Sequence, residues 1–382
     1  MKQGLFERVS DGFVFALAVV FAIGIRYLLR DFTTGDYENF TSVWYAAVQR
    51  DGFAAAGTAV SNYTPPYMYC LYLSSVLFPH VAPVIAIKIP SIGCDFACAW
   101  FVSRIVRLKY PDTRLPMFAF ISVLLAPTVI ANSSAWGQAD SIYAAMLAAC
   151  VYFLMTGRAA FAMMAFGLGL SIKFQTMFMA PALLALWLRR VVPTRALLLV
   201  PLVYAVAMVP AAVVGRPVSE LATIYFTQSV TYHSLTKNAP NLYAWLPDRF
   251  YGVIVVAGLL LMAVIGCWYT WKVWRSRARI DHDLILQLCL LSLLMVPFFL
   301  PKMHERFFFP ADVLAIAYGF YFPRQYYVPV AVSFASFFAY QPFLFHLQPL
   351  PLKLLSLVML VPLLAVALST RQGLMGAGAP QA

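Results

Sequence analysis

Long apolar runs alternate with short polar connections along the whole chain. Four of the longest runs approach or reach the length of a bilayer span, and they cover residues 13–25, 196–214, 253–267 and 352–368. Runs of this kind recur from end to end, and only helices or closed barrels satisfy their backbone polar groups in lipid. The pattern therefore predicts an all-α polytopic membrane protein with about 12 transmembrane helices.

The composition excludes a soluble globular protein. Hydrophobic residues make up 62% of the 382 residues and charged residues only 11%, with a mean hydropathy of +0.79. Soluble domains carry about 25% charged residues. A soluble chain with so few would lack the polar surface needed to cover its core.

The basic residues predict the orientation of the chain. The formal net charge is +12, and Lys and Arg cluster in short connections at residues 104–114, 189–195 and 272–279. Cytoplasmic connections carry an excess of such residues, and this assignment also places both termini in the cytoplasm. No basic tail or aromatic-interleaved basic patch remains, so no nucleic-acid partner is expected.

We expect one transmembrane domain over residues 1–382, without linkers or repeats. A first outer loop covers about residues 31–83 and contains two short amphipathic helices, near residues 38–50 and 66–77. The second is short for a full crossing, and whether residues 66–79 cross or re-enter the membrane stays open. Another outer loop covers about residues 216–249, and residues from about 370 to 382 form a disordered tail.

Polar residues gather on one side of the predicted bilayer. Four separate outer connections carry them, and they are Asp31, Asp36, Glu38, Asn62, Trp136, Gln138, Asp140, Lys173, Gln175, Lys302, His304, Glu305 and Arg306. A transporter places such groups near the middle of the membrane on broken helices. A site at one interface instead suits a substrate with its head group at the lipid surface and its tail in the bilayer.

Four motifs resemble the GT-C superfamily of glycosyltransferases. The segments 35–38 (Gly-Asp-Tyr-Glu) and 62–67 (Asn-Tyr-Thr-Pro-Pro-Tyr), together with Trp44, resemble its first outer loop. Residues 131–141 are similar to the second loop of GPI-type mannosyltransferases, and residues 170–175 and 301–306 match bacterial relatives of these enzymes. The motifs follow the same order over roughly the first 310 residues.

The resemblance implies an inverting glycosyltransferase that takes one sugar, mannose in most relatives, from a polyprenyl-phosphate donor. It implies that Asp36 is the general base, taking the proton of an acceptor hydroxyl. Candidates for the donor phosphate are Lys173, Lys302, His304 and Arg306. Candidates for contacts with the sugar or the acceptor are Glu38, Tyr63, Trp136, Gln138, Asp140, Glu305 and Asn241.

The expected partners follow from the same resemblance. They are the polyprenyl-phosphate sugar, membrane lipids, and an acceptor that is lipid-linked, a glycan or a protein. The expected location is the bacterial inner (plasma) membrane, with the site on the periplasmic side. We expect no metal requirement, because the chain has Thr34 where some relatives carry the first Asp of an Asp-x-Asp motif. Glu38, Asp140 and Glu305 are the residues that could still assemble a divalent metal site.

Plainer explanations compete with these roles. Asp36 is also a suitable N-cap for the helix that follows it. Trp136 is equally suited to anchoring the membrane interface, and Lys173 to extending toward it. Residues 302–306 could form a self-contained set of salt bridges. Rival functions are a lipid or polysaccharide transporter, and an O-antigen-type ligase or polymerase, for which an arginine-rich outer loop is expected.

Overall fold

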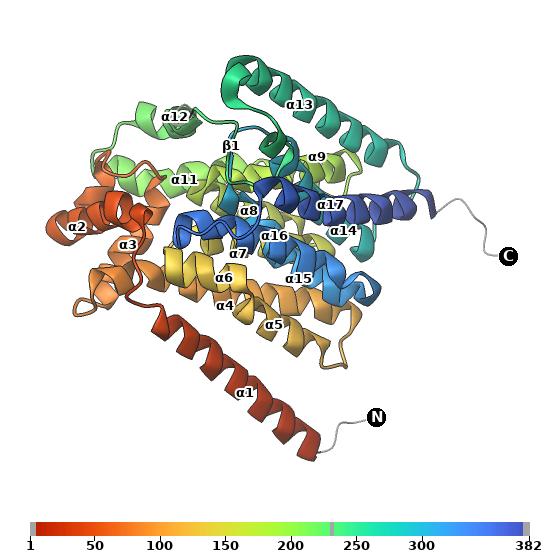
Figure 1. The fold of residues 1–382 in the computed structure, drawn as a ribbon, viewed down its shortest axis with the longest axis horizontal. Helices are drawn as coiled ribbons and strands as arrows, with labels where there is room; N and C mark the ends of the chain where they lie inside the picture. Colours follow the sequence, from red (N-terminus) through yellow and green to blue (C-terminus); the bar gives the residue numbers. More distant parts are fainter. Residues whose placement is uncertain (1–4, 230–232, 377–382) are drawn as a thin grey trace.

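The computed structural model describes residues 5–229 and 233–376, and its regular structure is almost entirely helical (Figure 1). The first helices are α1 (Leu5–Leu28), α2 (Ser42–Asp51), α3 (Pro65–Leu77), α4 (Pro83–Lys109), α5 (Leu115–Leu125), α6 (Pro127–Ile130), α7 (Asp140–Met155), α8 (Ala159–Ile172) and α9 (Ala180–Leu188). The later ones are α10 (Thr194–Leu197), α11 (Leu199–Val213), α12 (Val218–Ser229), α13 (Tyr251–Arg275), α14 (His282–Phe299), α15 (Phe309–Tyr321), α16 (Tyr327–Leu344) and α17 (Leu352–Met375). Two short strands, β1 (Thr236–Lys237) and β2 (Met303–His304), pair in parallel.

The chain is an integral membrane protein. Among the described residues, seven helices are long and apolar enough to cross a bilayer, or eight if the bent segment 115–136 is one span. The expectation of about twelve spans is not confirmed. Several helices of the bundle are shorter than a full crossing requires, such as α7 with 16 residues, α8 with 14 and α15 with 13.

The helices form a bundle with a buried centre and apolar flanks. Of the span in α14, 83% is buried, whereas the spans in α1 and α13 are only 11% buried. Figure 1 shows α1 and α13 along opposite edges of the molecule, with α4, α5, α7 and α15 between them. The exposed apolar faces of α1 and α13 are therefore suited to contact with lipid.

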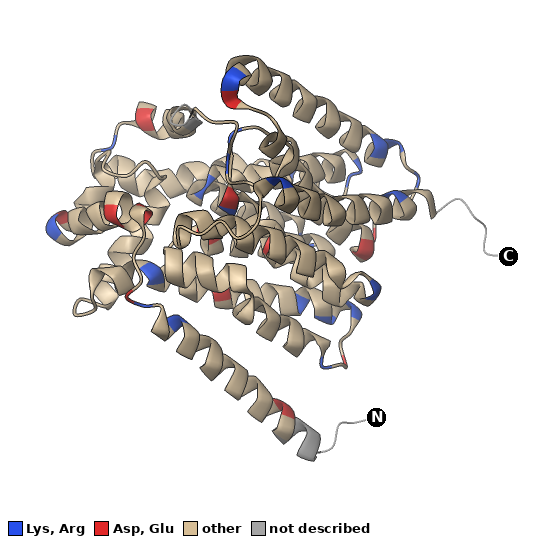
Figure 2. Ribbon diagram, in the orientation of Figure 1, with Lys and Arg blue, Asp and Glu red and all other residues tan. Residues whose placement is uncertain are grey.

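The two ends of the bundle differ. The end of α17 lies on the right of Figure 1, the start of α1 lies at the bottom and is the right-hand end of that helix, and α2, α3 and α12 lie on the left. Figure 2 shows Lys and Arg at the connections on the right, while the middles of the helices are mostly free of charge. This agrees with the prediction that the termini and the basic connections share one side.

The first outer loop contains the two short helices predicted for it, at α2 and α3. Since α3 has 13 residues, it is about 20 Å long, too short to cross a hydrocarbon core of about 30 Å.

The predicted disordered tail is partly wrong, because α17 continues to Met375. It does so because Thr370 is buried and the Ser276 hydroxyl donates a hydrogen bond to the Leu374 carbonyl. Residues 377–382 lie outside the described residues.

Two buried cations fix the path of the chain from α1 into the first outer loop. Arg26 donates from Nη2 to Asp95 Oδ2 at 2.9 Å, and Asp95 also accepts hydrogen bonds from Ser133 and Ser141, each at 2.6 Å. The Lys88 ammonium donates to the carbonyl oxygens of Leu29, Arg30 and Phe32 at 2.8–3.0 Å. These interactions tie the end of α1 to α4 and to the connection that precedes α7.

We expect Arg26→Met to lower the free energy of unfolding by about 3–5 kcal/mol, because it leaves the Asp95 carboxylate buried without its cation. Denaturant titration in mixed micelles would measure the change. Arg30→Met is the matched control, since Arg30 pairs with the exposed carboxylate of Asp31 and its loss should cost less than about 1 kcal/mol. Equal losses in the two variants would contradict this account.

Candidate functional site

One oxygen of the Asp36 carboxylate receives three donors from two distant connections. Trp136 donates from Nε1 to Oδ2 at 2.9 Å, and Gln138 donates from Nε2 to the same oxygen at 2.7 Å. Arg306 places Nη1 3.5 Å from it. Oδ1 accepts no hydrogen bond from the described residues, so it is available to a substrate.

The connection before α7 turns sharply, which directs the Trp136 and Gln138 side chains toward Asp36. Residues Ala131–Trp136 form a π-helical turn, which ends at Gly137 with φ +72°. This left-handed conformation is unfavourable for residues with a Cβ, and a Cβ on Gly137 would also lie 3.4 Å from Lys88 Cγ. Glycine therefore lets Trp136 and Gln138 face the same carboxylate.

The contacts of its oxygen orient the Gln138 amide. Tyr63 donates its hydroxyl to Gln138 Oε1 at 3.1 Å, and Lys173 Nζ lies 3.4 Å from the same oxygen. The amide nitrogen is then left to donate to Asp36. An amide fixed at both ends holds the carboxylate more rigidly than a single hydrogen bond would.

A buried ion pair between Lys173 and Asp140 lies next to the Gln138 amide. Lys173 Nζ lies 2.5 Å from Asp140 Oδ1, and Asn132 donates to Asp140 Oδ2 at 2.9 Å. The Asp140 side chain is fully buried, and that of Lys173 is 6% exposed. A buried pair with an additional hydrogen bond is geometrically well defined. Its contacts link α7 to the bend after α8.

Pairing between β1 and β2 holds the segment 301–306 in place. Met303 pairs with Thr236, and the Lys302 N–H donates to the Leu235 carbonyl at 2.7 Å. Lys302 has φ +65°, a conformation that is rare for residues with a Cβ and is often found at functional sites.

Arg306 then lies between several carboxylates. Its Nη1 is 3.5 Å from Glu305 Oε1, and its Nε is 3.9 Å from Asp140 Oδ2. The guanidinium also stacks over the Trp136 ring, 5.1 Å from its centre. Arg306 Nε is buried and has no hydrogen-bond partner among the described residues.

Burial shifts the pKa values of the titratable groups in this outer segment. It raises the pKa of the Glu305 carboxyl to about 7. Burial, together with Arg306, Lys237 and Lys173, lowers the pKa of His304 to about 2. The His304 imidazole is therefore neutral, so it can take part in hydrogen bonds but carries no positive charge.

A single cavity of about 1020 Å³ combines a polar end with an apolar arm. The polar end is lined by Asp36, Tyr63, Gln138, Lys173, Lys302, His304 and Arg306. The apolar arm runs between α8, α11, α12 and α13, and it is lined by Leu170, Val200, Pro201, Phe226, Val255 and Leu259. The cavity thus joins ionic groups to a hydrocarbon-compatible surface.

The remaining candidates from the sequence do not line this cavity. Trp136, Asp140 and Glu305 are buried behind it and contact protein. Trp136 stacks on Phe343 with ring centres 4.6 Å apart, so it is neither a free platform for sugar nor an anchor at the membrane interface. Glu38 is exposed outside the cavity.

Asn241 lies away from the cavity in the outer loop. It is fully buried, its side chain accepts a hydrogen bond from the Tyr243 N–H, and it donates to the Pro297 and Leu300 carbonyls. These contacts make Asn241 a structural residue rather than a contact for a sugar.

The sequence analysis did not predict that α12 lines part of the cavity. Tyr225 packs on Phe174 with ring centres 5.2 Å apart, and its hydroxyl donates to the Leu170 carbonyl. Gln228 donates to the Asn62 carbonyl and thereby connects α12 to the first outer loop. The only signal in the sequence is the aromatic pair at residues 225–226 within a segment otherwise read as a loop.

No metal site is evident in the described part of the chain. Over residues 5–229 and 233–376, no three His, Cys, Asp or Glu side chains come together in a way that could hold a metal ion. Asp140 and Glu305 both lie beside Arg306, and Glu38 is exposed elsewhere. The expectation of metal-independent activity stays a prediction.

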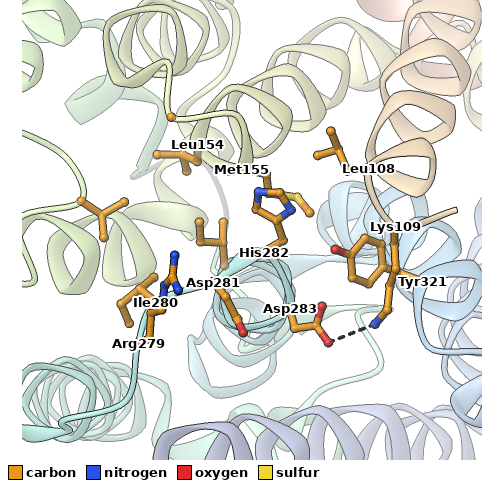
Figure 3. Close-up of a pocket in the computed structure, with 13 residues that line it drawn as sticks. Leu108, Lys109, Leu154, Met155, Arg279, Ile280, Asp281, His282, Asp283 and Tyr321 are labelled. Atoms are coloured by element: carbon orange, nitrogen blue, oxygen red, sulfur yellow. Dashed lines mark hydrogen bonds and ion pairs between the residues drawn. The ribbon is translucent and has the colours of Figure 1, made fainter. Parts of the chain in front are cut away.

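A second hollow, of about 660 Å³, lies at the opposite ends of the same helices (Figure 3). Three of its charged side chains are engaged with protein: Lys109 pairs with Asp283 at 3.0 Å, and the Asp281 side chain accepts from the Leu284 N–H at 2.9 Å. It is lined by the end of α4 and the start of α14, whereas the Asp36 cavity is reached from the other ends. The two hollows are separate.

Comparison with solved structures gives the fold. ArnT from Cupriavidus metallidurans bound to undecaprenyl phosphate superposes with a TM-score of 0.58 and 17% identity, over 95% of this chain and 72% of that chain. The apo state of the same protein superposes with a TM-score of 0.54 and 15% identity, over 96% of this chain and 78% of that chain. The chain has the GT-C fold. No protein-family model and no curated protein sequence matches it.

This is the fold that the motifs predicted. The superposition with ArnT covers 95% of this chain. At 17% identity the likeness establishes architecture and leaves sugar and acceptor open.

We expect the contribution of Glu305 to the stability of the protein to fall as pH rises from about 4.5 to about 7, opposite in sign to the contribution of His304, whose lowered pKa favours the folded state as pH rises. The buried carboxyl of Glu305 holds its proton in the folded state over this range, whereas the unfolded chain releases it, so raising the pH favours unfolding. The loss attributable to this group is on the order of 3 kcal/mol. Thermal unfolding of parent and Glu305→Gln across this range would measure it. A pH dependence of equal size in both proteins would contradict the assignment.

Proposed function

We propose that this protein is an inverting glycosyltransferase that moves one sugar, mannose, from a polyprenyl-phosphate donor to an acceptor hydroxyl. We place it in the bacterial inner membrane, with the reaction on the periplasmic side. One observation carries the proposal: a single cavity holds a carboxylate with an unengaged oxygen, three cationic side chains and an apolar arm.

Asp36 is suited to act as the base. Oδ2 is occupied by the donors from Trp136, Gln138 and Arg306, which fix the plane of the carboxylate. Oδ1 can then accept the proton of an acceptor hydroxyl. Such a positioned base contributes about 10²–10⁴ in rate.

The cations of the polar end are suited to the leaving group. Lys173, Lys302 and Arg306 line the same end of the cavity as Asp36. The donor is a phosphodiester with one negative charge, and the released polyprenyl phosphate carries up to two. Fixed cations near this phosphate stabilise the additional charge as it develops in the transition state.

The apolar arm is suited to the isoprenoid chain of the donor. It is lined by residues of α11 and α13, whose outer faces are largely exposed. The solved ArnT of the same fold was captured with undecaprenyl phosphate, which is a ligand of this class. A donor lying in the bilayer can therefore reach the polar end without leaving the lipid.

The reaction balances without a further reactant. The acceptor oxygen attacks the anomeric carbon, its proton passes to Asp36 Oδ1, and the bond between the anomeric carbon and the phosphate oxygen breaks. Attack from the side opposite the phosphate inverts the configuration. The products are the glycosylated acceptor and polyprenyl phosphate.

We expect Asp36→Asn to lower kcat by at least about 100-fold while polyprenyl phosphate still binds, because Asn keeps an acceptor oxygen for Trp136 and Gln138 but loses the base. Purified protein with radiolabelled polyprenyl-phosphate-mannose and a membrane lipid extract provides the assay. Asp31→Asn, which alters an exposed ion pair, is the control and should keep activity. Full transfer by Asp36→Asn would rule out this role.

We expect Lys302→Met to raise the donor KM by about tenfold or more, because it removes one cation from the phosphate end of the cavity. Initial rates at varied donor concentration would show this. Lys353→Met, an exposed lysine over Trp245, is the charge-matched control. An unchanged donor KM in Lys302→Met would remove Lys302 from the donor site.

We expect transfer to continue after EDTA treatment and dialysis, because Lys173, Lys302 and Arg306 supply the positive charge that a metal ion would otherwise provide. Rates before and after treatment, with and without added Mn²⁺, would be compared. Loss of activity that Mn²⁺ restores would show that a metal is required.

A further inference from the structure

Four polar side chains meet deep in the bundle, behind the candidate site. They are Tyr143 on α7, Asp312 on α15, and Ser336 and Tyr340 on α16, and each is at most 1% exposed. Neither oxygen of the Asp312 carboxylate has a hydrogen-bond partner among the described residues, and the three hydroxyls have none either. Buried polar groups in native proteins are almost always hydrogen-bonded, so a cluster of five such atoms requires an explanation.

The groups face one another across the helix contacts. Ser336 and Tyr340 are four residues apart on α16 and therefore share a face. The Ser336 hydroxyl faces the Asp312 carboxylate, yet the two do not form a hydrogen bond of acceptable geometry. Tyr143 and Tyr340 are both within electrostatic reach of Asp312 and of Asp140.

We propose that these four side chains enclose a buried water site, and that the resulting hydrogen-bond network positions Trp136 and, through it, Asp36. Water fits the chemistry of the cluster, because it can donate to the oxygens of the Asp312 carboxyl group and accept from the three hydroxyls. Buried waters typically make about three hydrogen bonds to groups that the protein leaves unpaired.

The link to the site runs through aromatic contacts. Tyr340 packs edge-on against the Trp136 ring, with centres 5.5 Å apart, and Phe343 of the same helix stacks on that ring. Trp136 Nε1 donates to Asp36 Oδ2. The network sets the position of α16, and α16 sets the position of the Trp136 indole. Asp312 is thus a positioning residue for the base of the proposed function.

The test uses 5-fluorotryptophan-labelled full-length protein in nanodiscs, with the Trp136 ¹⁹F resonance assigned by its loss in Trp136→Phe. We expect Asp312→Leu and Tyr340→Phe to shift this resonance and to lower kcat about tenfold at unchanged donor KM. Asp312→Asn, which keeps a polar group toward the water, should restore the parent resonance. Tyr318→Phe is the control, because it removes a buried hydroxyl that bonds to Gln325 at the far end of α15.

An unshifted Trp136 resonance in both Asp312→Leu and Tyr340→Phe would overturn the proposal. So would a density map at about 2 Å resolution in which the four side chains contact one another directly, with no ordered water among them. The inference rests on the proposed function only for the kcat readout. If the protein showed no transfer at all, the proposed function would fail, while the resonance and the map would still decide the positioning.

Discussion

A single carboxylate oxygen, Asp36 Oδ2, is where the first outer loop meets the connections before α7 and before α15. Trp136, Gln138 and Arg306 all direct N–H groups at it. Because these residues are far apart in the sequence, the interaction requires the whole helix bundle to be assembled. The same three donors leave Oδ1 unengaged, so the contact that joins the connections also prepares the carboxylate for chemistry.

Buried charges elsewhere in the bundle secure this arrangement. Arg26 and Asp95 join α1 to α4, and Lys88 binds the carbonyl oxygens at the end of α1, a few residues before Asp36. Lys173 and Asp140 join the bend after α8 to α7. An unpaired charge in an apolar interior is costly, so each pair permits few alternative arrangements of its helices. The positions of the outer connections follow from these pairs.

Much of the fold could be predicted from the sequence, because its determinants are local. Apolar runs indicate helical spans, and the order of four motifs indicates the GT-C fold. The number of spans could not be predicted in this way. Hydropathy does not distinguish a full crossing from a 13-residue buried helix such as α15. The helical continuation to Met375 also depends on a tertiary contact with Ser276.

The sequence indicated which residues gather near the site, but not which of them face the cavity. Trp136 turns away because Phe343 and Tyr340, two hundred residues further along, provide its packing surface. Asp140 points inward because Lys173 is buried beside it, and Asn241 is used to cap a helical turn. Such choices depend on partners from distant helices, which neither the motifs nor the periodicity of one segment can reveal.

A structure of the protein in lipid nanodiscs with a polyprenyl-phosphonate sugar, in which carbon replaces the scissile oxygen, would test the central claim most directly. The account predicts that the phosphonate contacts Lys302 and Arg306 and that the isoprenoid lies between α11 and α13. It also predicts that Asp36 Oδ1 faces the anomeric carbon from the side opposite the phosphonate. A head group bound elsewhere, or an Asp36 carboxylate directed away from the sugar, would contradict it.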